Sequence, residues 1–308
     1  MSGRTSGPVY SLFQPNGLQA HVRPRNQRMA DSEAMCTVVV SLAPEAPVPL
    51  LLLGVRDEFA GRPWQPPARH WQTPQTPQWS PLIGGLDEQA GGTWLAVHPD
   101  LPRVGCILNG RGELAPPGRR RSRGDLPLRA AAEGRQALSE LRQDPGTLSG
   151  YDPFYLVCAD LTGVLLLSWD GVSATLTELG PATHVLTNAG HMYPPTLGNQ
   201  QLGNQQKAPD EKARRFGPKF AAARPSGDRA ATLADAWAGW LTLAGGDGLS
   251  AAEPGAIIVR RDLPDGRVWG STSVTLVALA ADGGLRYDFQ PDPKTPPDPA
   301  TWYPVKTT

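Results

Sequence analysis

The chain has 308 residues, of which 40% are hydrophobic and 19% charged, a composition that suits a folded protein with a sizeable buried core. Its 29 Lys and Arg residues balance 29 Asp and Glu residues, so no net charge favours nucleic acid or an anionic membrane as a partner. The 34 Gly and 33 Pro residues exceed the usual share and predict long loops.

The cysteines and the apolar runs indicate in which cellular compartment the protein works. Cys36, Cys106 and Cys158 are odd in number and widely spaced, which excludes a disulfide framework, and no Cys/His spacing predicts a metal site. The longest early apolar run, residues 48–55, contains Pro49 and is too short to span a bilayer. Because the start also lacks the pattern of a signal peptide, we expect a cytoplasmic protein with no integral membrane segment.

The chain divides into three parts by composition. Residues 1–34 are polar and aperiodic, so we interpret them as a disordered leader or as the result of a misplaced start codon, since Met29 and Met35 offer alternative starts. We expect one domain over residues 35–290, followed by a Pro-rich tail at 291–308.

Short apolar and β-branched runs, separated by turn residues, predict strands along this domain. They cover residues 36–42, 49–54, 93–98, 103–109, 154–161, 164–169, 174–179, 184–187, 256–260, 273–279 and 285–289. Helical periodicity predicts helices over about 128–142 and 228–243. Two segments predict loops: the Pro/Trp/Gln-rich residues 61–83, and residues 194–227, an insertion in which Gly-Asn-Gln-Gln occurs twice.

The order of these elements indicates the fold class. Strands that cluster, rather than alternate strictly with helices, argue against a doubly wound parallel fold. The sequence therefore predicts an α+β fold of stacked sheets with helices on the outside. It contains no P-loop, no G-x-G-x-x-G after a strand, no H-E-x-x-H and no G-x-S-x-G.

Cys36 is the first candidate for chemistry, because it begins a predicted buried strand directly after Met35. If Met35 is removed, Cys36 carries a thiol and a free α-amine, with ordinary pKa values of about 8.5 and about 7.7–8.0. The amine can then take the thiol proton, so one residue supplies both nucleophile and base. With residues 1–35 attached, that nitrogen is an amide and cannot act as a base. The alternative is a cysteine with no chemical role.

Three charged residues, Arg56, Asp57 and Glu58, directly follow a buried apolar run. A cation near a thiol favours the thiolate, and a carboxylate can hold an α-ammonium. In a regular strand Arg56 and Asp57 point to opposite faces, so both can line one pocket only if the strand bends or bulges near Gly54. The alternative is an ordinary charged strand end.

Asn109 and Asn188 each end an apolar strand. A carboxamide N–H in that position can stabilise an oxyanion. Asparagine is also a common turn residue, so either position alone is a weak indication.

Together these motifs resemble the NRDE family, also called the transport-and-Golgi-organisation 2 family, over about residues 35–290. The start Met35-Cys36-Thr37 is similar to the family's N-terminus, and Val55-Arg56-Asp57-Glu58-Phe59 with Arg62-Pro63 to its Asn-Arg-Asp-Glu-Phe and Arg-Pro motifs. Its GxD and GGTWL signatures resemble Gly85-Leu86-Asp87 and Gly91-Gly92-Thr93-Trp94-Leu95. Later motifs follow in the family's order: Leu108-Asn109, Arg123-Gly124-Asp125-Leu126, Tyr151-Asp152-Pro153-Phe154 and Leu186-Thr187-Asn188-Ala189.

The resemblance implies a fold related to the N-terminal-nucleophile hydrolases, a four-layer αββα sandwich of two mainly antiparallel sheets between helix layers. The conjugated bile acid and penicillin V acylases of that superfamily are similar in arrangement. By that similarity Cys36 is expected to be nucleophile and base, Arg56 and Asp57 to orient and tune it, and Asn109 and Asn188 to be oxyanion or substrate ligands. We expect Glu58, Arg62, Thr93 and Trp94, which lie in the same motifs, to bind substrate.

Two positions depart from the family pattern. Val55 stands where the family's Asn is expected, and Thr272 stands where an Arg is expected in a Gly-Thr-Arg motif. Both changes remove a polar or cationic group from the expected site, and Arg260 or Arg261 is a candidate replacement for the missing cation.

Two functions fit these residues. The first is a cysteine amidohydrolase that cuts a linear amide in a small or lipid-like substrate. The second is a non-enzymatic carrier of haem or of an acyl or lipid ligand in the same pocket, with His98, His184 and His191 as candidate haem ligands, although such histidines are more often structural. A third hypothesis is a trafficking adaptor without a ligand. We expect no resident cofactor and no metal.

Overall fold

The computed structural model describes residues 36–194, 211–253, 255–294 and 298–307. Their strands form two antiparallel sheets. The first sheet runs in the order β11 (Gly190–Tyr193), β10 (Thr183–Thr187), β1 (Thr37–Leu42), β2 (Leu50–Phe59), β13 (Val268–Leu279), β14 (Leu285–Pro291) and β15 (Tyr303–Pro304), with β12 (Arg260–Asp262) beside β13. The second runs in the order β3 (Trp64–Ala68), β4 (Ile83–Asp87), β5 (Leu95–His98), β6 (Arg103–Asn109), β7 (Phe154–Asp160), β8 (Gly163–Trp169) and β9 (Ala174–Leu179).

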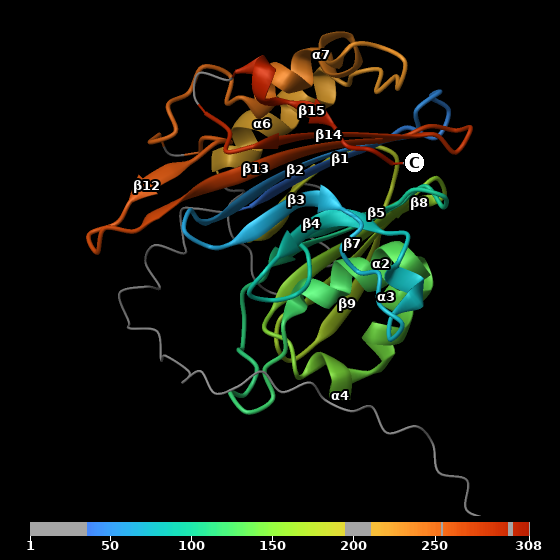
Figure 1. Ribbon diagram of the computed structural model, residues 1–308, viewed down its shortest axis with the longest axis vertical. Helices are drawn as coiled ribbons and strands as arrows, with labels where there is room; N and C mark the ends of the chain where they lie inside the picture. Colours follow the sequence, from blue (N-terminus) through green and yellow to red (C-terminus); the bar gives the residue numbers. More distant parts are fainter. Residues whose placement is uncertain (1–35, 195–210, 254, 295–297, 308) are drawn as a thin grey trace, which may run out of the picture.

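Helices cover the outer face of each sheet (Figure 1). The first sheet carries α6 (Glu211–Ala222) and α7 (Leu233–Ala244), and the second carries α2 (Leu126–Glu133), α3 (Arg135–Gln143) and the short α4 (Pro145–Leu148). Three short 3-10 turns are η1 (Pro77–Trp79), η2 (Arg123–Asp125) and η3 (Pro299–Thr301). The order helix, sheet, sheet, helix is the expected four-layer αββα sandwich of an α+β fold.

Strand β2 shows how one apolar run fills two cores. Leu50 and Leu52 pack between the two sheets, whereas Leu51, Leu53 and Val55 pack against α6 and α7. Successive side chains of a strand point to opposite faces, so a strand buried on both faces reads as a continuous hydrophobic run. The same alternation decides on which face of the sheet Arg56 and Asp57 lie.

Most of the predicted elements are confirmed. The hairpin predicted over 93–98 and 103–109 is β5 and β6, which pair antiparallel. The helix predicted over 128–142 is broken by Gly134 (φ 70°) into α2 and α3. The helix predicted over 228–243 begins only at Leu233, because the Thr232 hydroxyl caps it by accepting from the Asp235 backbone N–H.

The predicted insertion, residues 194–227, is wrong as a loop over its second half, which contains α6. Gly217 and Pro218 are poor helix formers and obscure the pattern. The helix is nevertheless stabilised because Ala213, Phe216 and Phe220 are fully buried against the first sheet. Residues 195–210 of the insertion, and the predicted leader at 1–34, lie outside the described residues.

Three other segments also differ from prediction. The loop predicted over 61–83 contains β3, an edge strand that tolerates Pro66 and Pro67 because it lacks a neighbour on one side. The strand predicted over 256–260 is only β12, which starts at residue 260. The tail predicted from residue 291 adds β15 to the first sheet and buries Val305. Within the described residues, none of the helices has the length and apolar character needed to cross a bilayer.

Candidate functional site

Cys36 lies immediately before β1 and contacts the backbone of β2. The backbone N–H of Asp57 donates to Cys36 Sγ at 3.2 Å, and the thiol donates to the Asp57 carbonyl oxygen at 3.5 Å. Cys36 is half-buried at the edge of the core between the sheets, whereas Cys106 and Cys158 are buried. Cys36 is therefore the thiol best placed to meet a ligand.

The strand registers identify the neighbours of Cys36. The pairing of Thr37 with Val55, continued by one residue, sets Arg56 beside Cys36, and Asn188 begins the turn directly after Thr187, which pairs with Thr37. Directly opposed residues of antiparallel strands share a face of the sheet. The Oδ1 atom of Asn188 is buried and has no hydrogen-bond partner in the part of the chain that the structure describes.

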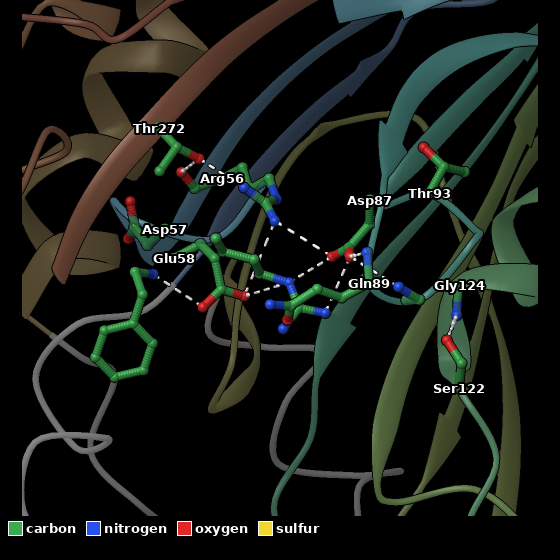
Figure 2. A network of polar contacts seen from close by, with 12 residues as sticks. Arg56, Asp57, Glu58, Asp87, Gln89, Thr93, Ser122, Gly124 and Thr272 are labelled. Atoms are coloured by element: carbon green, nitrogen blue, oxygen red, sulfur yellow. Dashed lines mark hydrogen bonds and ion pairs between the residues drawn. The ribbon is translucent and has the colours of Figure 1, made fainter. Parts of the chain in front are cut away.

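Arg56 is held from several sides on the face between the sheets, as Figure 2 shows. Its Nη1 donates to Thr272 Oγ1 at 2.9 Å, and its Nη2 lies 3.4 Å from Asp87 Oδ2. The same Nη2 lies 3.9 Å from Glu58 Oε2, and the guanidinium carbon lies 4.4 Å from the centre of the Trp94 ring. With 6% of its side chain exposed, Arg56 is a buried, rigidly oriented cation.

Arg62 completes this network. Its Nε donates to Asp87 Oδ2 at 2.6 Å and its Nη2 to Asp87 Oδ1 at 3.1 Å. The Arg62 Nε also lies 3.7 Å from Glu58 Oε2. Two cations and two carboxylates thus neutralise one another, so the positive field of Arg56 at the thiol is largely offset.

The surroundings of Cys36 disfavour its thiolate. Burial, with the Asp57 carboxylate nearby, raises the pKa of the thiol to about 12, and the Asp57 N–H and Arg56 oppose this only in part. A thiol with this pKa is protonated at neutral pH. Because the thiolate is the nucleophile, chemistry at Cys36 requires a base in direct contact with it.

Asp57 points to the other face of the sheet, because β2 stays regular there. We considered a bulge near Gly54 of β2, but the bulge lies in the neighbouring strand β13, between Ser271 and Ser273. Asp57 Oδ1 accepts from Ser271 Oγ at 2.6 Å, and Oδ2 lies 3.8 Å from Nζ of Lys212 on α6. Oδ2 is buried and has no hydrogen-bond partner among the described residues. Burial raises the pKa of Asp57 to about 6, although Lys212 and Ser271 lower it.

The opposite directions of these two side chains correct one expectation. Arg56 and Asp57 do not line one pocket with their charged groups, and Asp57 meets the thiol through its backbone. The bulge also explains Thr272, whose hydroxyl accepts from Arg56 Nη1 and donates to the Arg56 carbonyl oxygen at 3.2 Å. Thr272, which stands where the family pattern has an Arg, therefore anchors Arg56.

The GGTWL motif supports the site from the second sheet. Thr93 Oγ1 donates to the Leu95 carbonyl oxygen at 2.8 Å and accepts from the Leu95 N–H at 3.2 Å, so its hydroxyl is used within the backbone turn. A Cβ atom on Gly85 would lie 2.2 Å from the Trp94 ring. Gly85 therefore makes room for the indole that lies against Arg56.

Asn109 is separate from these residues. It is exposed at the end of β6, and it alternates with Leu108, which packs between the sheets. Its side chain therefore has the orientation of Ile107, which packs on the helix-covered face of the second sheet. The structure does not bring Asn109 to Cys36.

The three histidines that were candidate haem ligands each contact other groups of the protein. His184 Nδ1 lies 3.0 Å from His191 Nε2, and His184 Nε2 lies 2.8 Å from the Gly180 carbonyl oxygen. His98 lies on the other sheet, where its Nδ1 accepts from the Leu101 N–H at 3.1 Å. Within the described ranges, no group of three or more His, Cys, Asp or Glu side chains is arranged to hold a metal ion.

The family model described as Transport and Golgi organisation 2 matches residues 35–215. The chain belongs to this family. The matched range includes Cys36, the charges of β2 and Asp87, and it ends inside α6 just after Lys212. Ser271 and Thr272, which hold Asp57 and Arg56, lie beyond it.

No curated protein sequence matches the chain. Among solved structures, one titled as a Caenorhabditis elegans N-acylethanolamine-hydrolyzing acid amidase (NAAA) ortholog is similar, with 11% identity and a TM-score of 0.42. The alignment covers 80% of this chain and 96% of that chain. At this level of similarity no residue's role is carried over from that protein.

Four residues that complete the site were not predicted as site residues from the sequence, namely Asp87, Lys212, Ser271 and Thr272. Asp87 had a signal, because it is the acidic residue of the GxD motif and lies four residues before the start of GGTWL. The other three meet β2 only through tertiary pairing, from α6 and from the bulge of β13. No local pattern identifies such partners.

Proposed function

We propose that this chain is a cysteine hydrolase that cleaves a linear amide bond in a small or lipid-like substrate. Cys36 is the nucleophile, and its own α-amine is the base once the residues before it have been removed. The proposal places this reaction in the cytoplasm.

The observation that carries the proposal is a half-buried thiol near a buried oxygen that lacks a hydrogen-bond partner within the described residues. This oxygen is Oδ1 of Asn188, which directly follows the paired residues Thr187 and Thr37. Buried acceptors are nearly always paired, and an α-ammonium offers three N–H donors. A free N-terminus at Cys36, the residue before Thr37, would supply donors close to this acceptor.

The reaction follows from these groups. The α-amine takes the Sγ proton, and the thiolate attacks the carbonyl carbon of the amide. The tetrahedral oxyanion collapses, the C–N bond breaks, and the α-ammonium gives its proton to the leaving amine. Water, deprotonated by the same amine, then hydrolyses the thioester, which releases a carboxylic acid and restores the thiol.

The neighbours of Cys36 have distinct roles in this proposal. The Asp57 N–H, 3.2 Å from Sγ, stabilises the thiolate, since hydrogen bonds to charged acceptors are strong. Asn188 donates its amide N–H to the oxyanion. Arg56 orients the pocket and is itself fixed by Thr272 and Asp87.

The charge balance favours a neutral substrate. Glu58 and Arg62 are the more exposed members of the network, at 22% and 29%, and are the ones placed to meet a substrate. Because the network has as many cations as carboxylates and Cys36 borders an apolar core, an uncharged amide with an apolar acyl chain fits best.

One observation favours a second candidate, a non-enzymatic carrier of an acyl or lipid-like ligand. With a peptide bond at Cys36, the thiol has a pKa of about 12 and no side-chain base contacts it within the described residues, so the unprocessed chain is better suited to binding than to catalysis. Haem is the less favoured ligand, because His184 and His191 bind each other.

Three chains test the proposal. The first begins at Cys36 with a free amine, the second has one Gly before Cys36, and the third carries Cys36→Ala. With a fatty acyl p-nitroanilide, the first chain should release p-nitroaniline, and the second should be slower by about 10²–10⁴-fold, the usual contribution of a positioned base. Equal turnover by the first two chains would contradict the proposal. No turnover, with the same fluorescent fatty acid bound by all three, would support the carrier instead.

A further inference from the structure

A pocket of about 330 Å³ lies at the opposite end of β1 from Cys36. Ser41 stands five residues along the strand from Cys36, or about 17 Å at ~3.4 Å per residue, so the pocket is distinct from the candidate site. Its lining combines polar and apolar side chains, among them Ser41, Thr183, Arg224, Leu42, Pro194 and Ala221.

Arg224 brings a positive charge to this pocket without a carboxylate partner. Its Nη2 donates to the carbonyl oxygens of Val48 and Pro49 at 2.7 and 3.2 Å, and its Nε donates to Ser41 Oγ at 3.1 Å. In the described ranges, Nη1 has no acceptor and no carboxylate forms an ion pair with Arg224. Burial alone lowers the pKa of this guanidinium, the direction expected for a cation without a nearby anion.

Ser41 has a proton that the surrounding protein does not use. Its Oγ accepts from Arg224 Nε and also from Thr183 Oγ1 at 2.9 Å, and the residue is 1% exposed. Two accepted bonds occupy both lone pairs of the hydroxyl, which leaves its O–H to donate. Within the described part of the chain there is no acceptor for it.

We propose that this pocket binds a small anion, a carboxylate or phosphate group with a short apolar part, through Arg224 Nη1 and the Ser41 hydroxyl. A guanidinium suits both kinds of anion because its planar fork matches their oxygens. The apolar part meets Leu42, Pro194 and Ala221, and the volume limits the ligand to a small molecule. This site does not depend on any chemistry at Cys36.

Calorimetric titration of the full chain with butyrate and with inorganic phosphate tests the proposal, at an ionic strength held constant with sodium chloride. We expect saturable binding of at least one anion. Ala221→Phe puts a ring into the pocket without touching the Arg224 hydrogen bonds and should weaken binding at least about tenfold. Arg224→Gln removes the charge and should weaken it by about 10–100-fold.

Ala222→Phe is the matched control, because Ala222 is the next residue of α6, is exposed and does not line the pocket. It should leave affinity unchanged. Binding of phosphate alone or butyrate alone would identify the source of the anion, and either result supports the site. No saturable binding of either anion, or equal weakening by Ala221→Phe and Ala222→Phe, would overturn it.

Discussion

Arg56 and Asp57 are neighbours in the sequence but face two different environments. On the face between the sheets, Arg56 joins a neutral network that solvent reaches at Glu58 and Arg62. On the other face, Asp57 and Lys212 are sealed beneath α6, with side chains 0% and 4% exposed. The first face is therefore suited to meeting a substrate, while the second fixes the strand that carries the site.

The largest expected effect is on the sealed face. Asp57→Asn removes the carboxylate paired with buried Lys212 and should lower the free energy of unfolding by about 3–5 kcal/mol, the usual cost of removing one partner of a buried ion pair. Urea denaturation measures this. Asp262→Asn is the control, since its pair with Arg260 is exposed, and should cost about 1 kcal/mol or less. Similar losses in both variants would contradict the burial of the Asp57–Lys212 pair.

On the accessible face, the loss of stability on replacing an arginine of the network should be larger for the more buried arginine. Arg56→Met should cost about 2–3 kcal/mol, because it removes charge-assisted bonds from a buried cation. Arg62→Met should cost about 1 kcal/mol or less, because Arg62 is partly exposed. Thermal unfolding of both variants checks the order, and a larger loss for Arg62→Met would contradict the assigned role of Arg56 as the network's anchor.

Gly85, on the second sheet, should affect the face that carries Arg56 indirectly, through the Trp94 ring. Gly85→Ala places a Cβ atom 2.2 Å from the Trp94 ring and should cost about 1–3 kcal/mol by overpacking. It should also change the tryptophan fluorescence, as the indole moves against Arg56. Gly61→Ala meets no atom within 4 Å and should change stability by about 0.5 kcal/mol or less. An unchanged spectrum and stability for Gly85→Ala would show that Trp94 is not confined.

The most gradual effect is the pH dependence contributed by Asp57. Its pKa rises from an ordinary 3.8 to about 6 on folding, so the folded state holds the proton more tightly. The stabilisation from this proton is complete below pH 3.8 and is lost as pH rises to about 6. Subtracting the Asp57→Asn profile from the wild-type profile should therefore give a curve that falls between these values. A difference that rises there would contradict the burial of Asp57.

Local sequence patterns predicted the sheets well because each strand fills a core on at least one face. Most residues of β1, β7, β8 and the first half of β2 are apolar, and β5 and β6 form a short hairpin, so hydrophobic runs and turn residues are enough to predict these strands. Segments whose stability comes from tertiary burial were missed. In α6, Gly217 and Pro218 lower helix propensity, and only contact of Phe216 and Phe220 with the sheet compensates.

Some residues of the candidate site could be predicted from the sequence, but its geometry could not. Cys36, Arg56 and Asp57 stand out as a cysteine before a strand and charges after a buried run. Whether Arg56 and Asp57 meet depends on which strand bulges, and that was β13 rather than β2. The partners Lys212 and Thr272 lie more than 150 residues away in the sequence, where no spacing rule applies.

Trapping the acyl-enzyme tests the central claim most directly. A chain that begins at Cys36 is mixed with a fatty acyl p-nitroanilide, and the reaction is stopped with acid. The protein is then digested in acid, and the mass of its N-terminal peptide is measured by mass spectrometry. We predict one added acyl group on the Cys36 peptide, and none on the chain with Gly before Cys36. Equal acylation of both chains, or release of p-nitroaniline with no acyl group on Cys36, would contradict a nucleophile activated by its own amine.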